Sequence, residues 1–288
     1  MDYQKINDEF YNRNFWRVDR SEEKWFSKYV KVKILKKMIK NIKKGVIYDA
    51  GGGVGNYGWY FGRDFKKTIV SDISQVALNQ IPEKNIIRLK CSVLDNKLPD
   101  SYADCILLID VFEHINKTDL PRMMKDLKRV LKPDGRILMF TSHYGYVFGA
   151  IPQRLFNLNR RLLGNESSEG HVNRLTFREF KHLFKESGLI IDDYYFYSVF
   201  FQQITDLIKD SFSRFASVVL KRQKNDENMG RKGQSIKEDL KKKEKSPLLR
   251  IPLLISSYLS YSDVLLFGKI PLGNSVFFSL RKENTIKL

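Results

Sequence analysis

Short apolar runs alternate with amphipathic stretches along most of the chain. Apolar residues recur at helical spacing from Trp25 to Ile39, after a segment at 19–22 that resembles a capping box. From residue 46 the pattern predicts, in order, strand 46–50, a helix from about 56, strand 68–72, helix 74–80, strands 86–90 and 103–109, helix 118–131 and strand 135–141. This alternation favours an α/β fold with a doubly wound, Rossmann-like and mainly parallel sheet.

Turn and cap signals organise the second half of the chain. The sequence Lys132-Pro133-Asp134-Gly135 predicts a turn that ends one helix and starts the next strand. Thr176-Phe177-Arg178-Glu179 looks like a capping box, and the helix that it opens should end near Gly188. Strand 189–198 and a last strand at 274–281 complete the predicted elements.

About 75 residues separate these last two predicted strands. Apolar residues recur at helical spacing from Phe200 to Leu220, and a second apolar stretch runs from Leu248 to Phe267. Arg250, Pro252 and Asp263 make the second stretch unsuitable for a transmembrane helix. Residues 223–246 hold almost no large apolar side chain, so we expect that stretch to be mobile.

We therefore expect three parts. An N-terminal helical segment (1–44) serves as a lid or packs on the sheet, and residues 45–199 with 270–288 form the main domain. Residues 200–269 form an amphipathic, basic helical insertion. The insertion either caps the site alone or also lies in a membrane interface.

Composition narrows the class of protein. A hydrophobic content of 42% and 20 phenylalanines are ample for a core, and both cysteines fall in apolar runs, as buried thiols do. The net charge of +18 suits nucleic acid or an anionic membrane, and residues 221–250 hold eleven Lys/Arg against five Asp/Glu. No motif of an RNA or DNA reader accompanies this charge. Because no apolar segment opens the chain, we expect a cytoplasmic location, with peripheral attachment at the inner face of the membrane as an alternative.

The stretch from Val46 to Asn56 carries the most specific chemistry. A short apolar run delivers Asp49 into a turn with glycines at 51, 53 and 55, which let the backbone approach a ligand closely. Seventeen residues after Gly55, a second apolar run ends in Asp72, which could accept both hydroxyls of a ribose. The two runs predict a pocket for a nucleoside-containing cofactor.

The acids around these glycines separate two kinds of cofactor. The same turn satisfies the weak dinucleotide pattern GxGxxG, but Asp49 would lie close to a pyrophosphate, whereas it suits a cationic group. A later run, Tyr102 to Ile115, ends in Asp110-Val111-Phe112-Glu113-His114. In this order and spacing, the runs resemble the class I S-adenosylmethionine-dependent methyltransferases over roughly residues 45–198 and again near the C-terminus.

The resemblance implies a role for each matching residue. Asp49 would hold the methionine ammonium, directly or through water, and Gly51, Gly53 and Gly55 would line the path of the methionine and ribose. Asp72 would accept the ribose hydroxyls. The remaining cofactor contacts would come from Ile73 beneath the adenine, Ser92 and Val93 after the third strand, and Asp110 and Val111 at the methionine portion. The family fold also implies that the last strand inserts antiparallel between its neighbours.

The acceptor side rests on three histidines, His114, His143 and His171, which all fall where loops leave the expected C-terminal edge of the sheet. His114 is a candidate general base, although Glu-His at this point also has a structural interpretation. His171 either acts on the acceptor or positions its loop. Some relatives bind a divalent metal through positions matching Asp110, Glu113 and His114, but we expect no metal here.

The function predicted from sequence is methyl transfer from S-adenosylmethionine to a small or lipid-linked acceptor, at oxygen. The layout from Thr141 to Phe184 resembles that of the ubiquinone-pathway O-methyltransferases. An RNA methyltransferase is the first alternative, although Asp110 to Glu113 replaces the motif expected for base N-methylation. A non-catalytic protein that retains the fold is the second.

Overall fold

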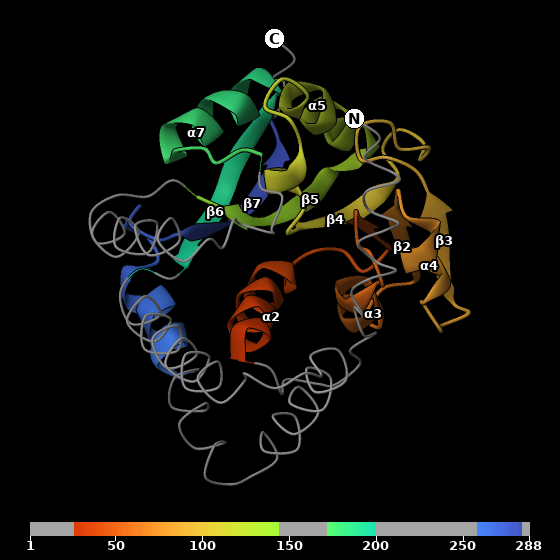
Figure 1. The fold of residues 1–288 in the computed structure, drawn as a ribbon, viewed down its shortest axis with the longest axis horizontal. Coiled ribbons are helices and arrows are strands. Elements are labelled where there is room, and N and C mark those ends of the chain that lie inside the picture. The colour runs from red at the N-terminus through yellow and green to blue at the C-terminus, as the bar shows by residue number, and fades with distance from the viewer. Residues whose placement is uncertain (1–25, 144–171, 198, 200–257, 284–288) are drawn as a thin grey trace, which may run out of the picture.

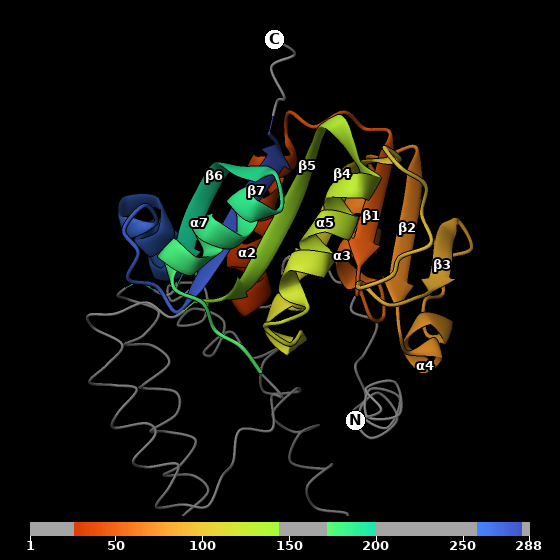
Figure 2. The ribbon, with the colours of Figure 1, turned by 90° about the horizontal axis from the view of Figure 1, so that it is seen from above.

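The computed structural model describes residues 26–143, 172–197, 199 and 258–283. These residues form a seven-stranded sheet in the order β3 (Ile86–Lys90), β2 (Lys67–Asp72), β1 (Val46–Ala50), β4 (Ala103–Ile109), β5 (Leu131–Ser142), β7 (Ser275–Lys282) and β6 (Leu189–Tyr197). Figure 1 shows the fold, and Figure 2 labels the strands side by side in this order. Strand β7 is antiparallel to both β5 and β6, whereas β1 to β5 are mutually parallel. The predicted sheet and its antiparallel last strand are confirmed.

Helices cover both faces of the sheet. On one face lie α5 (Leu120–Val130) and α7 (Phe177–Glu186), and on the other lie α2 (Phe26–Ile39) and α3 (Asn56–Gly62), as Figure 2 shows. The fully buried β4 serves both cores, because Ile106 and Leu108 point to the first and Cys105 and Leu107 to the second. A continuous apolar run suits a central parallel strand that is buried on both sides.

Caps set the start of two helices. Ser74 begins α4 (Gln75–Asn79), and its hydroxyl accepts a hydrogen bond from the Ala77 amide at 3.2 Å. At α7 the capping box predicted at 176–179 is present, with Thr176 and Glu179 accepting each other's backbone amides. These caps satisfy amides that have no partner within the helix.

The strand β5 departs from the sequence prediction. It begins at Leu131, directly after α5, and not at residue 135 after a separate turn. Leu131 pairs with Ala103, and the next pair joins Arg136 to Cys105, so residues 132–135 form an irregularity within the strand. Lys132 lies there with its ammonium 2.7 Å from the Asp104 carboxylate. Residues 132–135 therefore form a bulge within β5 and not a turn before it.

Several sequence predictions fall outside the described residues. These are the N-terminal lid and capping box before residue 26, the loop with His171, and the part of the insertion between 200 and 257. The end of the insertion is described, and residues 258–267 form a helix whose Val264 packs against the core that holds α2. None of the described helices has the length and apolar character that a membrane crossing requires.

Phe278 of β7 should be a major stability determinant. Its ring is fully buried, with the centroids of Phe180 and Phe184 each at 5.1 Å. Phe278→Ala should lower the free energy of unfolding by about 3–5 kcal/mol, because it removes buried area and leaves a cavity. Urea unfolding would measure the change. Leu266→Ala, at an exposed position, is the control and should change stability by less than about 0.5 kcal/mol. A similar loss in both variants would contradict this assignment of the core.

Candidate cofactor site

Three glycines shape the loop between β1 and α3. Gly51, Gly53 and Gly55 have φ angles of 70°, 55° and 71°, a left-handed conformation that costs other residues about 1–2 kcal/mol. A Cβ built on Gly51 would lie 2.8 Å from Val111 Cγ2 and 3.5 Å from Val93 Cγ1. The loops after β1, β3 and β4 therefore meet at Gly51, and its missing side chain leaves the space for that meeting.

Asp72 at the end of β2 is tied to the glycine loop. Its Oδ2 accepts a hydrogen bond from the Gly53 amide at 2.9 Å, and its Oδ1 accepts one from the Ser74 amide at 2.8 Å. The carboxylate is buried and held at both oxygens beside the loop. Ile73, partly buried, follows directly. Asp72 thus lies directly beside the glycine loop, and its contact with a ribose stays a prediction.

Asp49 lies beneath the same loop. Only 2% of the residue is exposed, and its Oδ2 accepts a hydrogen bond from the Gly58 amide of α3 at 2.7 Å. Burial raises the pKa of this carboxyl to about 7; the Gly58 amide opposes the rise, and the nearby Asp72 charge adds to it. Asp49 therefore fixes the start of α3 and places a titratable negative charge under the loop.

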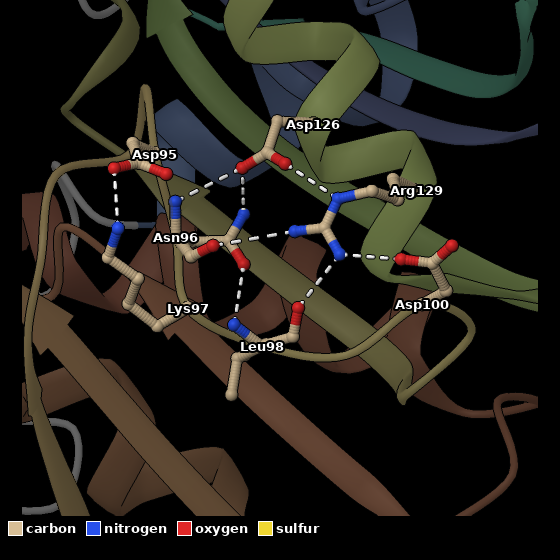
Figure 3. Close-up of polar contacts among 7 residues, drawn as sticks. All are labelled: Asp95, Asn96, Lys97, Leu98, Asp100, Asp126 and Arg129. Carbon is tan, nitrogen blue, oxygen red and sulfur yellow. Dashed lines mark hydrogen bonds and ion pairs between the residues drawn. The ribbon is translucent and has the colours of Figure 1, made fainter.

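The loop after β3 is held by a polar network, drawn in Figure 3. Asp126 of α5 accepts hydrogen bonds from the backbone and side-chain amides of Asn96, and Arg129 donates to the Leu98 carbonyl at 2.9 Å. Arg129 also lies 2.7 Å from Asp100. This network anchors the loop that carries Ser92 and Val93. The Ser92 hydroxyl accepts a hydrogen bond from the Leu94 amide at 3.1 Å, so it also shapes its own turn.

Asp110 stands where β4 ends, in a left-handed conformation with φ of 56°. Its carboxylate accepts hydrogen bonds from the Lys31 ammonium of α2, at 2.9 Å and 2.6 Å. That ammonium also lies 4.1 Å from the centroid of the Phe140 ring. Burial raises the pKa of Tyr57, and the charges of Asp110 and Asp49 add to the rise, so all three polar groups share one neighbourhood.

Lys31 is the site residue that sequence reasoning missed. Nothing in its spacing along the chain distinguishes it from Lys33 or Lys36. The structure distinguishes it, because the Lys31 ammonium pairs with Asp110 and only 15% of the Lys31 side chain is exposed. A sequence signal exists only in hindsight, since Lys31 lies between the buried Val30 and Val32.

The predicted acid and histidine after β4 face different environments. Glu113, in the 3₁₀ turn η1 (Phe112–His114), is buried, and the Thr141 hydroxyl donates to its carboxylate at 2.9 Å. Burial raises the pKa of Glu113, and the Asp110 charge adds to the rise. His114 is exposed at the end of the same turn. Of this pair, only His114 is available to an incoming acceptor.

The other two predicted histidines do not join His114 in the described structure. His143 is buried beside Phe196, and its Nδ1 lies 2.8 Å from the Gly273 carbonyl, to which it donates. Burial lowers the pKa of His143, and this hydrogen bond opposes the change. Its surroundings favour a role in joining β5 to the segment before β7. His171 lies outside the described residues, although the next amide, of Val172, donates to the Glu113 carbonyl at 2.9 Å.

No cluster of three or more His, Cys, Asp or Glu residues suited to a metal occurs in the part of the chain that the structure describes. In the set considered from sequence, Asp110 is paired with Lys31, and Glu113 accepts from Thr141. The absence of a metal remains a prediction.

The arrangement fits S-adenosylmethionine. A left-handed glycine loop meets two apolar side chains, Val93 and Val111, and the Asp72 carboxylate is fixed beside the loop. Two further acids, Asp49 and Asp110, lie at the ends of β1 and β4. Apolar contacts suit an adenine, Asp72 suits ribose hydroxyls, and the acids suit the cationic methionine end. The predicted cofactor residues, Ile73 and Ser92 included, thus lie on loops that leave one edge of the sheet.

Comparison with known proteins agrees with this fit. A family model described as a methyltransferase domain matches residues 23–193, more than half of the chain. Among curated proteins, the 2-phytyl-1,4-naphtoquinone methyltransferase of Trichormus variabilis is 31% identical over 90 residues, which are 31% of this chain and 38% of that protein. The match thus spans well under half of the relative's length.

Two solved structures resemble the fold over nearly the whole chain. The geranyl diphosphate C-methyltransferase of Streptomyces coelicolor, solved with S-adenosyl-L-homocysteine, has a TM-score of 0.54 at 12% identity, covering 98% of this chain and 99% of that one. The phosphoethanolamine N-methyltransferase 2 of Haemonchus contortus, also solved with S-adenosylhomocysteine, has a TM-score of 0.53 at 16% identity, covering 98% and 58%. At these identities the likeness concerns the fold. With the family match, it establishes that the chain belongs to the methyltransferase domain family, within the class I S-adenosylmethionine-dependent methyltransferases.

Proposed function

We propose that this protein transfers a methyl group from S-adenosylmethionine to a hydroxyl oxygen of a small, lipid-linked acceptor at a membrane surface. The observation that carries the cofactor part is the hydrogen bond from the Gly53 amide to the Asp72 carboxylate, which fixes the loop and the acid as one unit. The family match supports the reaction class. Support for the acceptor comes from the quinone methyltransferase relative, whose named substrate carries a phytyl chain.

The chain's own residues hold the cofactor in this proposal. Asp72 accepts the ribose hydroxyls, Val93 and Val111 flank the loop at Gly51, and the Asp49 charge favours the cationic methionine end from below. S-adenosylmethionine supplies a methyl group on a positively charged sulfur, which needs no further activation. The protein must mainly align donor and acceptor, and good alignment is worth effective molarities of about 10⁵ M or more.

His114 is the proposed general base for the acceptor hydroxyl. It is exposed in the turn after β4, and its imidazole would take the hydroxyl proton as the oxygen bonds to the methyl carbon and S-adenosylhomocysteine leaves. The buried Glu113 next to it is held by Thr141 and keeps the turn in place. His114 acts on the acceptor, and Glu113 positions it.

Binding of the cofactor should depend on Asp72 and Gly53. Asp72→Ala removes the acceptor of the Gly53 amide and the predicted ribose contacts, at about 1–3 kcal/mol for charged hydrogen bonds. Gly53→Val adds a side chain at a φ of 55°. Calorimetry should show S-adenosylhomocysteine binding to the parent protein, weakened at least about tenfold in each variant.

Asp192→Ala is the matched control, because this exposed acid of the edge strand β6 pairs with Arg136 and Arg281 and lies outside the loops that were assigned to the cofactor. It should bind S-adenosylhomocysteine as the parent does. Binding of NADH in place of S-adenosylhomocysteine would contradict the cofactor assignment.

Cofactor affinity should rise with pH through the pKa of Asp49, which is about 7 without ligand. Below that pH the carboxyl is mostly protonated, and a cationic ligand must displace the proton, which weakens binding by up to about tenfold per pH unit. Calorimetry between about pH 6 and pH 8, in two buffers of different ionisation enthalpy, would detect proton release at the lower pH. Asp49→Asn should abolish both effects. Equal affinity and no proton release across this range in the parent protein would refute the assignment.

Turnover should depend on His114. His114→Ala should lower methyl transfer by about 10²–10⁴-fold and leave S-adenosylhomocysteine affinity nearly unchanged. The assay follows labelled methyl groups into a lipid extract that contains prenylated quinols. His182→Ala, an exposed histidine on α7, is the control. Label entering RNA and not lipid would favour the RNA alternative, and no transfer despite cofactor binding would favour the non-catalytic one. Unchanged turnover in His114→Ala would limit this residue to a structural role.

A further inference from the structure

The helix at residues 258–267 buries two polar residues and exposes several large apolar ones. Its acid, Asp263, is fully buried, and the Asp263 Oδ2 accepts a hydrogen bond from the Val199 amide at 3.0 Å. Ser260 is buried as well. Leu265 and Leu266, in contrast, are 52% and 70% exposed. A helix on the surface of a soluble domain normally turns its apolar side inward.

The exposed large apolar residues of this segment are here called the apolar ridge: Tyr258, Leu259, Leu265, Leu266, Phe267 and Ile270. Positions 258, 259, 265 and 266 share one helical face by their spacing. Single exposed apolar residues need no explanation, but a contiguous group of them marks an interaction site. Among the eight large hydrophobic residues recorded as exposed in the described part of the chain, six belong to this ridge.

A row of positive charge flanks the apolar ridge. Tyr29 of α2 contacts the 258–267 helix, with ring centroids 6.2 Å from Tyr258 and 6.5 Å from Tyr261. On α2, the Lys33 ammonium lies 5.4 Å from the Tyr29 ring, and Lys37 follows one turn later. The sequence of α2 contains lysines and no acid. The apolar ridge and the lysines of α2 therefore form one surface, basic along its side.

Contacts link this surface to the ends of β4 and β5, near the candidate general base His114. Lys31, on the same helix as Lys33, contacts Asp110 at the end of β4. The segment that follows the ridge supplies the Gly273 carbonyl that His143 contacts at the end of β5. Both links lead from the surface to the edge of the sheet where the cofactor loops gather. A lipid-linked acceptor entering there would have its chain near the apolar ridge.

We propose that the apolar ridge docks into the interface of an anionic lipid bilayer, with Lys33 and Lys37 over the headgroups. This inference rests on the proposed function, in that the bilayer would deliver the lipid-linked acceptor. Apolar residues bordered by lysines match the acyl boundary and the anionic headgroups of such a membrane. A second copy of the chain fits less well, because a two-fold contact through the ridge would bring the lysine rows of both copies near each other. RNA would pair with the positive charge of the lysines, but it offers no apolar partner to the leucines.

The test is flotation of the full-length protein with vesicles of phosphatidylcholine, with and without phosphatidylglycerol. The parent protein should bind the anionic vesicles and lose part of that binding at high salt, which screens the lysines and leaves the apolar term. The double variant Leu265→Asp with Leu266→Asp should bind at least about tenfold more weakly, because charged groups oppose insertion at the interface. Lys33→Glu with Lys37→Glu should lower binding and remove most of its dependence on phosphatidylglycerol.

Ile87→Asp provides the matched control, since Ile87 is an exposed apolar residue on β3, distant in sequence and on the edge strand of the sheet. It should bind vesicles as the parent does. All variants should keep their S-adenosylhomocysteine affinity, which shows that they are folded.

The outcomes separate this inference from the proposed function. Undiminished vesicle binding by the leucine variant would overturn the inference. So would a parent protein that ignores vesicles, or a dimer in light scattering that the leucine variant converts to a monomer. Methyl transfer to a detergent-dispersed acceptor is measured independently. If methyl transfer persists while vesicle binding is absent, the surface assignment fails and the proposed reaction stands. If vesicle binding is present without any methyl transfer, the proposed reaction fails and the surface assignment stands.

Discussion

The hydrogen bond between the Gly53 amide and the Asp72 carboxylate joins two elements on which the rest of the site depends. It requires the loop after β1 to turn in a left-handed conformation, so that an amide at its centre points to the end of the next strand. The same turn brings Gly51 against Val93 and Val111. Without these contacts the loops after β1, β2, β3 and β4 would have no common geometry. Because the elements beneath are buried strands, the loop ends have little freedom to separate.

A group of carboxyls is the second organising feature. Asp49 under the loop and Glu113 in η1 are buried, whereas Asp110 at the end of β4 is exposed. The Asp110 charge is near enough to raise the pKa of Glu113. Like charges in low dielectric disfavour one another's ionisation. Lys31 pairs with the Asp110 carboxylate. A backbone amide donates to Asp49, and a hydroxyl donates to Glu113. The unbalanced negative character favours a cationic ligand over a dinucleotide with its pyrophosphate.

The helix α2 connects the cofactor loops to the outer surface. Lys31 of α2 donates to the Asp110 carboxylate. Tyr29, near the beginning of α2, contacts the helix at 258–267. A displacement of α2 would therefore reach both the end of β4 and the apolar ridge. If the acceptor comes from a membrane, α2 would hold the docking surface at a fixed distance and orientation from the reacting groups. The buried Asp263 of the 258–267 helix fits this arrangement, because it accepts a hydrogen bond from the Val199 amide and so fastens the helix.

The sequence by itself determined the local features: the glycine loop, the acids that end β1 and β2, the buried run of β4 and the capping box of α7. Each is encoded by residues adjacent in the chain, through backbone freedom, period or a cap, and neighbouring residues suffice to read it. Tertiary structure alone decided which lysine of α2 meets Asp110, that His143 is enclosed while His114 is exposed, and that residues 132–135 bulge β5. These outcomes depend on contacts between residues far apart in the chain, such as Lys31 with Asp110, His143 with Gly273, and Lys132 with Asp104. A pattern along the chain records which residues are apolar or charged, but the packing of separate elements determines which of them meet and which lose contact with water.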